Sequence, residues 1–486
     1  MILTLLFSLL SGALLPLAFS PFNIDSFAFI MPAVLLFILL KSSAKKAFLL
    51  SWIFGLGFFG VGTSWVYISI HQFGNSSVFL AGLITVLLTM YLALFFATFG
   101  FVFRKFFSRK SETIQCLFAF PALWTLWEYL RCELFTGFPW LLLGYSQLAT
   151  PLHGFAPVFG VFGVSFITAL ISGALVLLAT RQSFPIKLMS LIFIFGFIGA
   201  GFLLSKKTWT TPIGKPIQVS LIQGNIAQSI KWDANFAKQN MSIYKNLTFQ
   251  HWDSQLIIWP EGAFPFTAED SLNFINSLSN MAQQHNSNII FGVPIENKKT
   301  TDYYNGLLLI GNNRGGYLKE HLVPFGEYTP LLFIFKGIMN YFQIPMSGFT
   351  KGPRHQPLLK LNTILIAPFI CYEIAFPMEV LRHAETSNIL LTVSDDSWFG
   401  KSIALAQHMQ MGQMRALEMG RPVLLSTNTG ITAFISPAGK ILQGAPINQR
   451  MVLTDFVQPM TGKTPLMRWH YYPVGITVLV LLLMSL

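Results

Sequence analysis

Charged residues are scarce in this sequence. Asp, Glu, Lys and Arg make up 11% of its 486 residues, against about 25% in an ordinary soluble domain. Hydrophobic residues make up 53%, and the mean hydropathy is +0.56. So little charge excludes a disordered chain, and the apolar excess excludes an ordinary soluble protein that hides its apolar residues in its own cores. The composition indicates an integral membrane protein.

Cysteine is equally rare, and the three present are Cys116, Cys132 and Cys371. Their spacing provides neither a disulfide framework nor a zinc site. The polar part of the chain also lacks a Gly-rich phosphate loop and a G-x-S-x-G elbow, and its histidines show no metal-binding spacing. We therefore expect no cofactor and no metal. The net charge of +12 does not by itself indicate nucleic acid, because membrane proteins also use basic residues for topology.

The charge that is present lies mostly in one block. Residues 1–205 hold ten Lys or Arg and four Asp or Glu, whereas residues 206–470 hold 22 and 16. Residues 471–486 hold none. This distribution predicts a membrane domain over 1–205, a soluble domain over 206–470 and one closing transmembrane helix over 471–486.

The first part contains seven apolar segments that approach the roughly 20 residues needed to cross a bilayer. With the eighth, they cover residues 2–20, 24–40, 47–70, 78–103, 114–132, 154–180, 187–205 and 471–486. Lys and Arg gather in the even-numbered loops, as at Lys45 and Arg104, while the odd loops 71–77 and 146–153 have neither. The positive-inside rule then predicts that both termini are cytoplasmic and that the soluble domain is periplasmic, on the inner membrane of a bacterium.

Two features of the membrane part need an interpretation. The segment GLGFFG at 55–60 has the spacing of a dinucleotide fingerprint, but it lies inside an apolar span, so we expect close helix packing instead. Glu128, Arg131 and Glu133 lie near the outer end of the fifth span. Either they form an interfacial ion pair on one helix face, or they help to line a lipid head-group site that faces the soluble domain.

Short apolar strands alternate with helical patterns in the soluble block. Strands are expected at 217–223, 255–261, 288–294, 306–311, 363–371, 388–394, 422–426, 431–436 and 451–456. Helices are expected near 234–250, 270–285, 376–385 and 402–419. Alternation of this kind predicts a layered α/β or α+β sandwich. The very apolar segment 330–346 is either a core helix or an arm that touches the bilayer, and we favour the arm.

Three local sequences carry residues suited to nucleophilic catalysis. Glu261 lies in IIWPEGAFP, Lys319 and Glu327 lie in GYLKEHLVPFGEYTP, and Cys371 follows an apolar strand in APFICYEIAFP. A lone cysteine after a buried strand is often only a small packed hydrophobe. In an oxidising compartment, however, a free thiol suggests a functional need, and a carboxylate base with a nearby ammonium group would activate it.

The order WPE, then Lys before PFGE, then CYE resembles the Glu–Lys–Cys pattern of the nitrilase, or carbon–nitrogen hydrolase, superfamily. With apolar spans on both sides, nearly the whole chain is similar to its membrane-embedded branch, the apolipoprotein N-acyltransferase family. Further segments agree at 223–232, 395–400, 408–422 and 426–439. The loop DDSWFG at 395–400 departs from the NDAWFG-like form that is commoner in that family.

This resemblance implies an α-β-β-α sandwich and a ping-pong acyl transfer. Cys371 would take an acyl chain from the sn-1 ester of a phospholipid, expected to be phosphatidylethanolamine, as a thioester. The α-amine of a diacylglyceryl-cysteine at an apolipoprotein N-terminus would then receive it. Glu261 would act as the base and Lys319 would stabilise the oxyanion, in a chain expected to be monomeric.

The resemblance also implies supporting residues. Glu327 and Glu373 would orient the lysine and the surroundings of the nucleophile, although Glu327 could instead be a solvated loop carboxylate. Trp232, Tyr372 and Trp398 would contact the acyl chain or a lid, with core packing as an equal alternative. Two other functions stay open: a membrane-tethered nitrilase-like amidase that releases acid to water, and a transporter or sensor whose soluble domain only binds a ligand.

Overall fold

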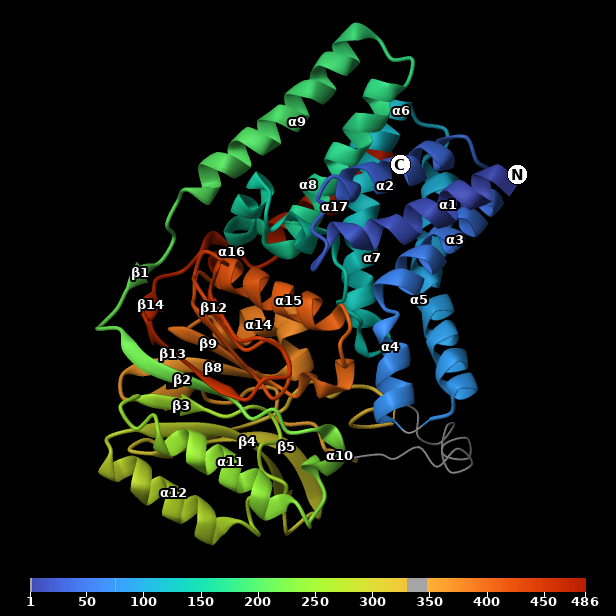
Figure 1. Cartoon of the computed structure of the whole chain (residues 1–486). Coiled ribbons are helices and arrows are strands. Elements are labelled where there is room, and N and C mark those ends of the chain that lie inside the picture. Colours follow the sequence, from blue (N-terminus) through green and yellow to red (C-terminus); the bar gives the residue numbers. More distant parts are fainter. Residues whose placement is uncertain (1, 75, 330–347) are drawn as a thin grey trace.

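The computed structural model describes residues 2–74, 76–329 and 348–486, in which a helical bundle stands against a β-sandwich (Figure 1). Within these residues, four helices are long and apolar enough to cross a membrane. They are Ala44–Gly62 (α3), Val78–Phe107 (α5), Pro151–Ala179, which contains α8 (Ala156–Ala179), and Phe184–Ser205 (α9). The predicted arm at 330–346 lies outside the described residues.

The other predicted spans fall on shorter helices. Three apolar helices, Ile2–Ala18 (which contains α1, Ile2–Leu14), Phe27–Leu40 (α2) and Tyr472–Ser485 (α17), have fewer than 18 residues. The segment 114–132 is interrupted, because a π-helical turn over Gln115–Ala119 precedes α7 at Phe120–Glu133. Length and apolar composition alone therefore account for four of the eight spans that we expected.

The glycines of α3 allow helices to approach closely. A Cβ built on Gly55 would lie 2.8 Å from Cα of Ala93 in α5, and one on Gly57 would lie 2.3 Å from the carbonyl oxygen of Leu9 in α1. Side chains at these positions would force the helix backbones apart. The prediction that GLGFFG serves helix packing is confirmed.

Two six-stranded sheets make up the sandwich of the described residues. One has the order β13 (Met451–Val457), β2 (Ile217–Gln223), β3 (Leu256–Ile258), β4 (Asn288–Asn297), β5 (Asp302–Gly311) and β6 (Gly315–Leu318). The other has the order β12 (Ile441–Gly444), β11 (Ala433–Ile435), β10 (Val423–Thr427), β9 (Ile389–Ser394), β8 (Ile364–Ile370) and β7 (Leu359–Leu361). Neighbours β2, β3 and β4 run parallel, as do β8, β9 and β10.

Every predicted strand segment contains a strand. The short strands β6, β7 and β12 were missed, as was the two-stranded pair of β1 (Thr211–Pro212) and β14 (Met460–Thr461). The apolar residues between the sheets, such as Leu221, Ile258, Ile370 and Leu391, form one continuous core. Helices α11 (Ala237–Phe249) and α12 (Leu272–Gln284) cover the outer face of the β2 sheet. The predicted α-β-β-α layering is therefore observed.

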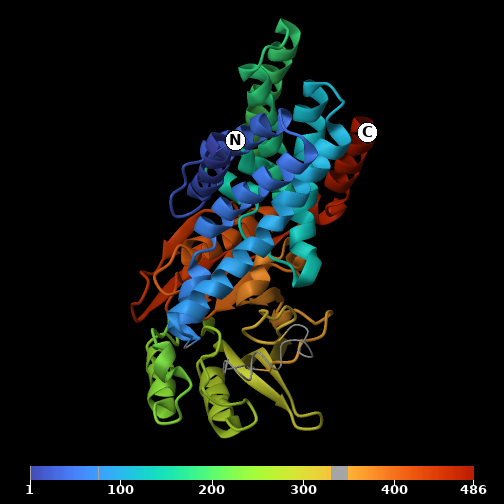
Figure 2. The ribbon, with the colours of Figure 1, turned by 90° about the vertical axis from the view of Figure 1, so that its right-hand side faces the viewer.

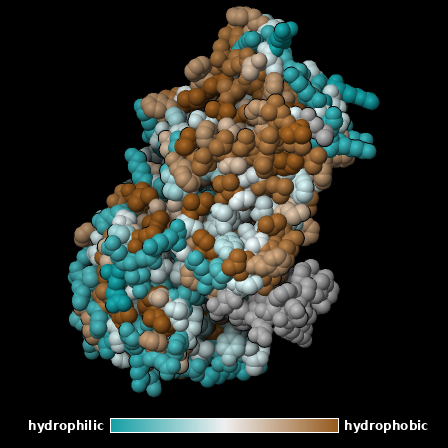
Figure 3. Space-filling view, turned by 45° about the vertical axis from the view of Figure 1, so that its right-hand side comes forward, coloured by the Kyte–Doolittle hydropathy of each residue, from teal (hydrophilic) through white to brown (hydrophobic). Residues whose placement is uncertain are grey.

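The remaining helical layer joins the sandwich to the bundle. Helices α14 (Pro377–Ala384) and α15 (Ala404–Met419) cover the β8 sheet and share one hydrophobic core with α7 and α8. Figures 1 and 2 show the bundle on this side of the sandwich and α11 and α12 on the far side. Apolar residues dominate the bundle surface in Figure 3, whereas the sandwich surface is mostly hydrophilic.

Candidate active site

Cys371 occupies a strained position at the end of a buried strand. The pairing of β8 with β9 ends at Ile370, opposite Val393, and a 3₁₀ turn over Cys371–Ala375 begins at the next residue. The backbone of Cys371 has a φ of +53°, in the left-handed region. This conformation costs a non-glycine residue about 1–2 kcal/mol, and such strain in native structures is concentrated at functional sites.

The ammonium group of Lys319 lies between two carboxylates. Its Nζ is 2.9 Å from Oε1 of Glu327 and 3.4 Å from Oε1 of Glu261, and only 1% of the side chain is exposed. Burial alone lowers the pKa of Lys319, but Glu261 and Glu327 together raise it above its usual value. The lysine is therefore held as a cation. Glu327 is not a solvated loop carboxylate, since it also accepts the N–H of Val323 at 2.8 Å.

Asn305 joins the same two carboxylates and was missed in the sequence. Its Nδ2 donates to Oε1 of Glu261 at 2.7 Å and to Oε1 of Glu327 at 2.8 Å. With Lys319, it keeps two like-charged groups side by side. A polar residue directly before the apolar run at 306–311 was the available signal, but only the pairing of the strands places it beside Glu261.

A second buried ion pair fixes Glu261 from the other side. Nζ of Lys231 lies 2.5 Å from Oδ2 of Asp395 and donates to the carbonyl oxygen of Glu261 at 3.0 Å. The N–H of Asp395 donates to Oε2 of Glu261 at 2.9 Å. Both residues lie in segments, 223–232 and 395–400, that the family resemblance had drawn attention to, without a role for either residue.

Glu373 ties the lysine loop to the nucleophile strand. Its Oε1 accepts the N–H groups of Glu320 at 2.6 Å and His321 at 3.0 Å, and its Oε2 accepts the N–H of Ile370 at 2.7 Å. Burial raises its pKa to about 7 against the opposing effect of these N–H donors. Since it is buried among backbone donors, Glu373 holds the loop after Lys319 next to the turn at Cys371.

The charges around Cys371 act on its thiol in opposite directions. Burial and the negative charge of Glu261 raise the pKa of Cys371 well above its usual value, and Lys319 lowers it. At neutral pH the thiol is therefore protonated, and it needs a base at the moment of reaction. The chemistry available to this arrangement is general-base nucleophilic catalysis with a cation beside the nucleophile.

The three predicted aromatic contacts lie in different surroundings. Trp232 and Trp398 are 48% and 43% exposed, so neither is a core residue. Trp398 faces Phe73 of the bundle with ring centroids 6.1 Å apart. The hydroxyl of Tyr372 donates to the carbonyl oxygen of Gly137 at 3.1 Å, which ties the residue after Cys371 to the bundle.

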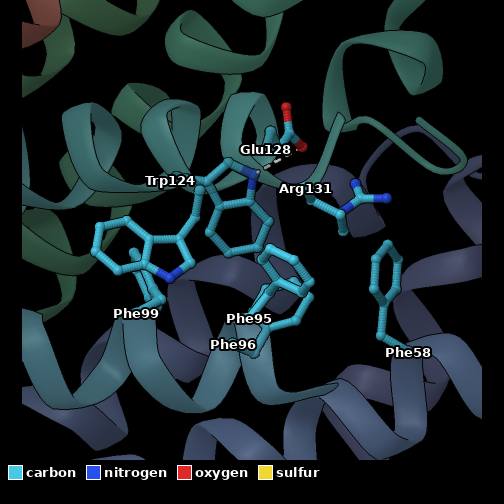
Figure 4. A pocket seen from close by; sticks show the side chains of 8 residues that line it. Phe58, Phe95, Phe96, Phe99, Trp124, Glu128 and Arg131 are labelled. Carbon is cyan, nitrogen blue, oxygen red and sulfur yellow. Dashed lines mark hydrogen bonds between the residues drawn. The ribbon is translucent and has the colours of Figure 1, made fainter. Parts of the chain in front are cut away.

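Glu128 and Arg131 do not form the expected ion pair. Glu128 accepts the N–H of Leu143 at 2.7 Å, and Nη1 of Arg131 donates to the carbonyl oxygens of Phe138 and Trp140. Both side chains hold the loop that follows α7, while Glu133 is exposed. They also line a small pocket between α3, α5 and α7, in which Trp124, Phe95 and Phe96 converge and Arg131 lies beside Phe58 (Figure 4). A lipid head-group role stays a prediction.

Comparison with known proteins bears on both halves of the chain. Residues 11–174 match the apolipoprotein N-acyltransferase N-terminal domain, and residues 218–465 match the carbon-nitrogen hydrolase family. An apolipoprotein N-acyltransferase of Coxiella burnetii is 50% identical over 477 residues, covering 98% of each chain. One of Azotobacter vinelandii is 41% identical over 482 residues, covering 98% of this chain and 93% of its own.

Among solved structures, Saccharomyces cerevisiae Nit3, a member of branch 10 of the nitrilase superfamily, aligns at 18% identity with a TM-score of 0.38 over 51% of this chain and 92% of that chain. The family assignment rests on the full-length relatives and on the two family matches, of which the first covers the bundle and the second covers the sandwich. This chain belongs to the apolipoprotein N-acyltransferase family, as a bacterial membrane acyltransferase whose second half is a carbon–nitrogen hydrolase domain.

Proposed function

We propose that the protein transfers a fatty acyl chain from the sn-1 position of a phospholipid, expected to be phosphatidylethanolamine, to the α-amine of the N-terminal diacylglyceryl-cysteine of an apolipoprotein. The observation that carries the proposal is the Lys319 ammonium, held between Glu261 and Glu327 beside the strained turn of Cys371. The names of the full-length relatives support the lipoprotein acceptor.

In the first half-reaction, Glu261 takes the thiol proton as Sγ of Cys371 attacks the ester carbonyl carbon. The oxygen of the tetrahedral intermediate becomes negative, and Lys319 donates hydrogen bonds to it. As the intermediate collapses, the carbon–oxygen bond breaks and Glu261 returns the proton to the departing glycerol oxygen. A thioester and a lysophospholipid result. Such a base contributes roughly 10²–10⁴ in rate, and losing an oxyanion donor costs roughly 10²–10³.

In the second half-reaction, the lipoprotein amine attacks the thioester carbonyl carbon and loses a proton to Glu261. Collapse breaks the carbon–sulfur bond and forms the amide, and the thiolate of Cys371 regains the proton. Because α14 and α15 pack against the apolar bundle, a donor and an acceptor already in the membrane are the natural substrates. Exposed Trp232 and Trp398 are proposed to contact an acyl chain.

The proposal includes the arrangement in the membrane. Eight spans would place both termini in the cytoplasm and the catalytic domain, residues 206–470, in the periplasm, between the membrane domain at 1–205 and the last span at 471–486. The absence of Lys and Arg from loops 71–77 and 146–153 supports this orientation. We propose that the monomer is active, since the proposed catalytic groups come from one chain.

Intact-protein mass spectrometry with phosphatidylethanolamine in detergent tests the proposal. We expect wild type to gain the mass of one acyl group and Cys371→Ala to gain none, and a diacylglyceryl-cysteine peptide should discharge the adduct. Cys132→Ala is the control, because that thiol is buried in the bundle. Free fatty acid without transfer to the peptide would support the tethered amidase instead, and an adduct on Cys371→Ala would refute the proposed nucleophile.

A further inference from the structure

The main-chain carbonyl of Cys371 needs a partner outside the sheet. Pairing with β9 ends one residue earlier, and the left-handed conformation turns the Cys371 carbonyl away from the sheet ladder. Nε2 of His408, on α15, lies 3.1 Å from this carbonyl oxygen and is positioned to donate to it. His408 is 1% exposed. A buried carbonyl without a donor is rarely tolerated, so this contact helps to define how the chain turns at the nucleophile.

His408 is itself supported by Asp396, which follows the neighbouring strand β9, and Asp396 is supported by Ser394, the last residue of that strand. Its Nδ1 lies 3.3 Å from Oδ1 of Asp396, and the hydroxyl of Ser394 donates to that same oxygen at 2.5 Å. Both residues are at most 2% exposed. A Cβ on Gly430 would lie 2.5 Å from Oδ2 of Asp396, so a side chain at this position would displace the carboxylate.

The bundle supplies the last support. The indole of Trp140 lies nearly parallel to the His408 ring, with an interplanar angle of 12° and centroids 6.3 Å apart. Its Nε1 donates to Oε1 of Gln407 at 2.6 Å, and its carbonyl oxygen accepts from Arg131 at 2.5 Å. The loop after α7 therefore packs against His408, the histidine that contacts the main-chain carbonyl of Cys371.

We infer that His408 and Asp396 are positioning residues that hold Cys371 in its reactive backbone conformation, and that Trp140 of the membrane domain completes their support. Neither residue is catalytic in the strict sense, because the Nε2 that faces the site is occupied by a main-chain oxygen. The effect of His408 and Asp396 on acyl transfer rests on the proposed function. Their effect on the backbone and thiol of Cys371 does not depend on that function.

Four variants of the full chain test the inference: His408→Ala, His408→Gln, Asp396→Asn and Trp140→Leu. We expect His408→Ala to lower kcat for acyl-enzyme formation on the order of 10²-fold with KM for the phospholipid little changed, since small misplacement of reacting groups has effects of that size. His408→Gln retains an N–H donor for the carbonyl and should recover part of the loss. Asp396→Asn and Trp140→Leu should give kcat values between those of His408→Ala and His408→Gln.

Two further measurements separate positioning from general destabilisation. In His408→Ala, hydrogen exchange should accelerate in the peptide that covers Cys371–Ala375, and the rate at which iodoacetamide alkylates Cys371 should change. His285→Gln is the matched control, because His285 also stacks on a tryptophan, Trp252, but on the far face of the sandwich. It should match wild type in every assay.

Three results would each overturn the inference: wild-type kinetics in His408→Ala, a loss in His408→Ala that His408→Gln does not partly recover, or hydrogen exchange in Cys371–Ala375 of His408→Ala equal to that of wild type. If wild type forms no acyl-enzyme at all, the proposed function fails, while exchange and alkylation still decide whether His408 positions Cys371.

Discussion

Cys371, the proposed nucleophile, is weakly reactive as it rests in this structure, and that determines what the proposed base Glu261 would have to do. Burial and the carboxylate of Glu261 both raise the pKa of the thiol, and Lys319 offsets only part of this. A thiol kept protonated is protected from adventitious oxidation, because the thiolate is the reactive form. Its proton is removed only when the base and an electrophile are both in place.

The Glu261→Gln variant should therefore change two rates in opposite directions. Removing the negative charge lowers the pKa of Cys371, so iodoacetamide should alkylate it faster at pH 8 than in wild type. Acyl-enzyme formation should fall by roughly 10²–10⁴, because the base is gone. Peptide mapping gives the first rate and intact mass the second, and Glu296→Gln, at a half-buried carboxylate on β4, is the control. Slower alkylation of Cys371 would contradict the stated role of Glu261.

Lys319 separates two carboxylates, so its loss should destabilise the fold. Since its pKa is raised in the folded state, its stabilising effect is complete below the unfolded value and is lost only as pH rises through the folded one. In Lys319→Met the facing carboxylates repel, with a destabilisation of about 3–5 kcal/mol at pH 8. Lys319 keeps its charge from pH 5 to pH 8 in the folded and in the unfolded chain, so its own titration adds no pH dependence in this range.

Thermal unfolding of wild type and of Lys319→Met at pH 8 measures this destabilisation. The double variant Lys319→Met/Glu327→Gln should regain stability at pH 8, because the repulsion is removed, but it should not regain acyl transfer. No recovery of stability in the double variant would show that repulsion between Glu261 and Glu327 is not the cause.

At the scale of elements, the bundle depends on helices that touch backbone to backbone. Helix α3 packs against α1 and α5 through Gly57 and Gly55, where no side chain fits. The loop after α7 is the complementary element, since its residues Gly137 and Trp140 contact the turn that carries Cys371 and helix α15. This loop therefore connects the packing of the bundle to the turn at Cys371.

Gly57→Ala should destabilise the bundle by about 1–3 kcal/mol, because the new Cβ would lie 2.3 Å from a main-chain oxygen of α1. Gly82→Ala in α5 is the matched control, with no atom within 4 Å of its new Cβ. That change should be neutral or slightly stabilising, since alanine favours helix. Thermal unfolding in detergent compares them, and equal effects of the two variants would argue against close packing at Gly57.

At the scale of the whole molecule, the two halves share one core. Residues of α14 and α15 belong to the same hydrophobic cluster as those of α7 and α8, so the sandwich is not an independent body resting beside the helices. This continuity places the carbon–nitrogen hydrolase domain directly against the bundle, whose surface is mostly apolar in Figure 3.

The proposed orientation can be tested by cysteine labelling in a Cys371→Ala background. Ser76→Cys, in the loop before α5, should react with a membrane-impermeant maleimide in intact spheroplasts. Arg109→Cys, after α5, should react only once the membrane is permeabilised. The reverse pattern would place the catalytic domain in the cytoplasm and refute the proposed topology.

The sequence by itself determined the membrane character and the strand segments, and it singled out Glu261, Lys319 and Cys371, whose catalytic roles stay a proposal. Each depends on local signals: scarcity of charge, short apolar runs, and residues within ordered motifs. The layered sandwich followed from the same alternation of strands and helices.

Only the tertiary structure decided which polar groups meet. Asn305 joins Glu261 to Glu327, Lys231 pairs with Asp395, and Arg131 holds a loop carbonyl instead of Glu128. These partners lie on different elements, and sequence spacing does not encode which strand or loop lies beside which. The physical reason is that a buried polar group takes whichever partner the packing of distant segments brings within hydrogen-bond reach, and that packing is decided by the whole chain at once.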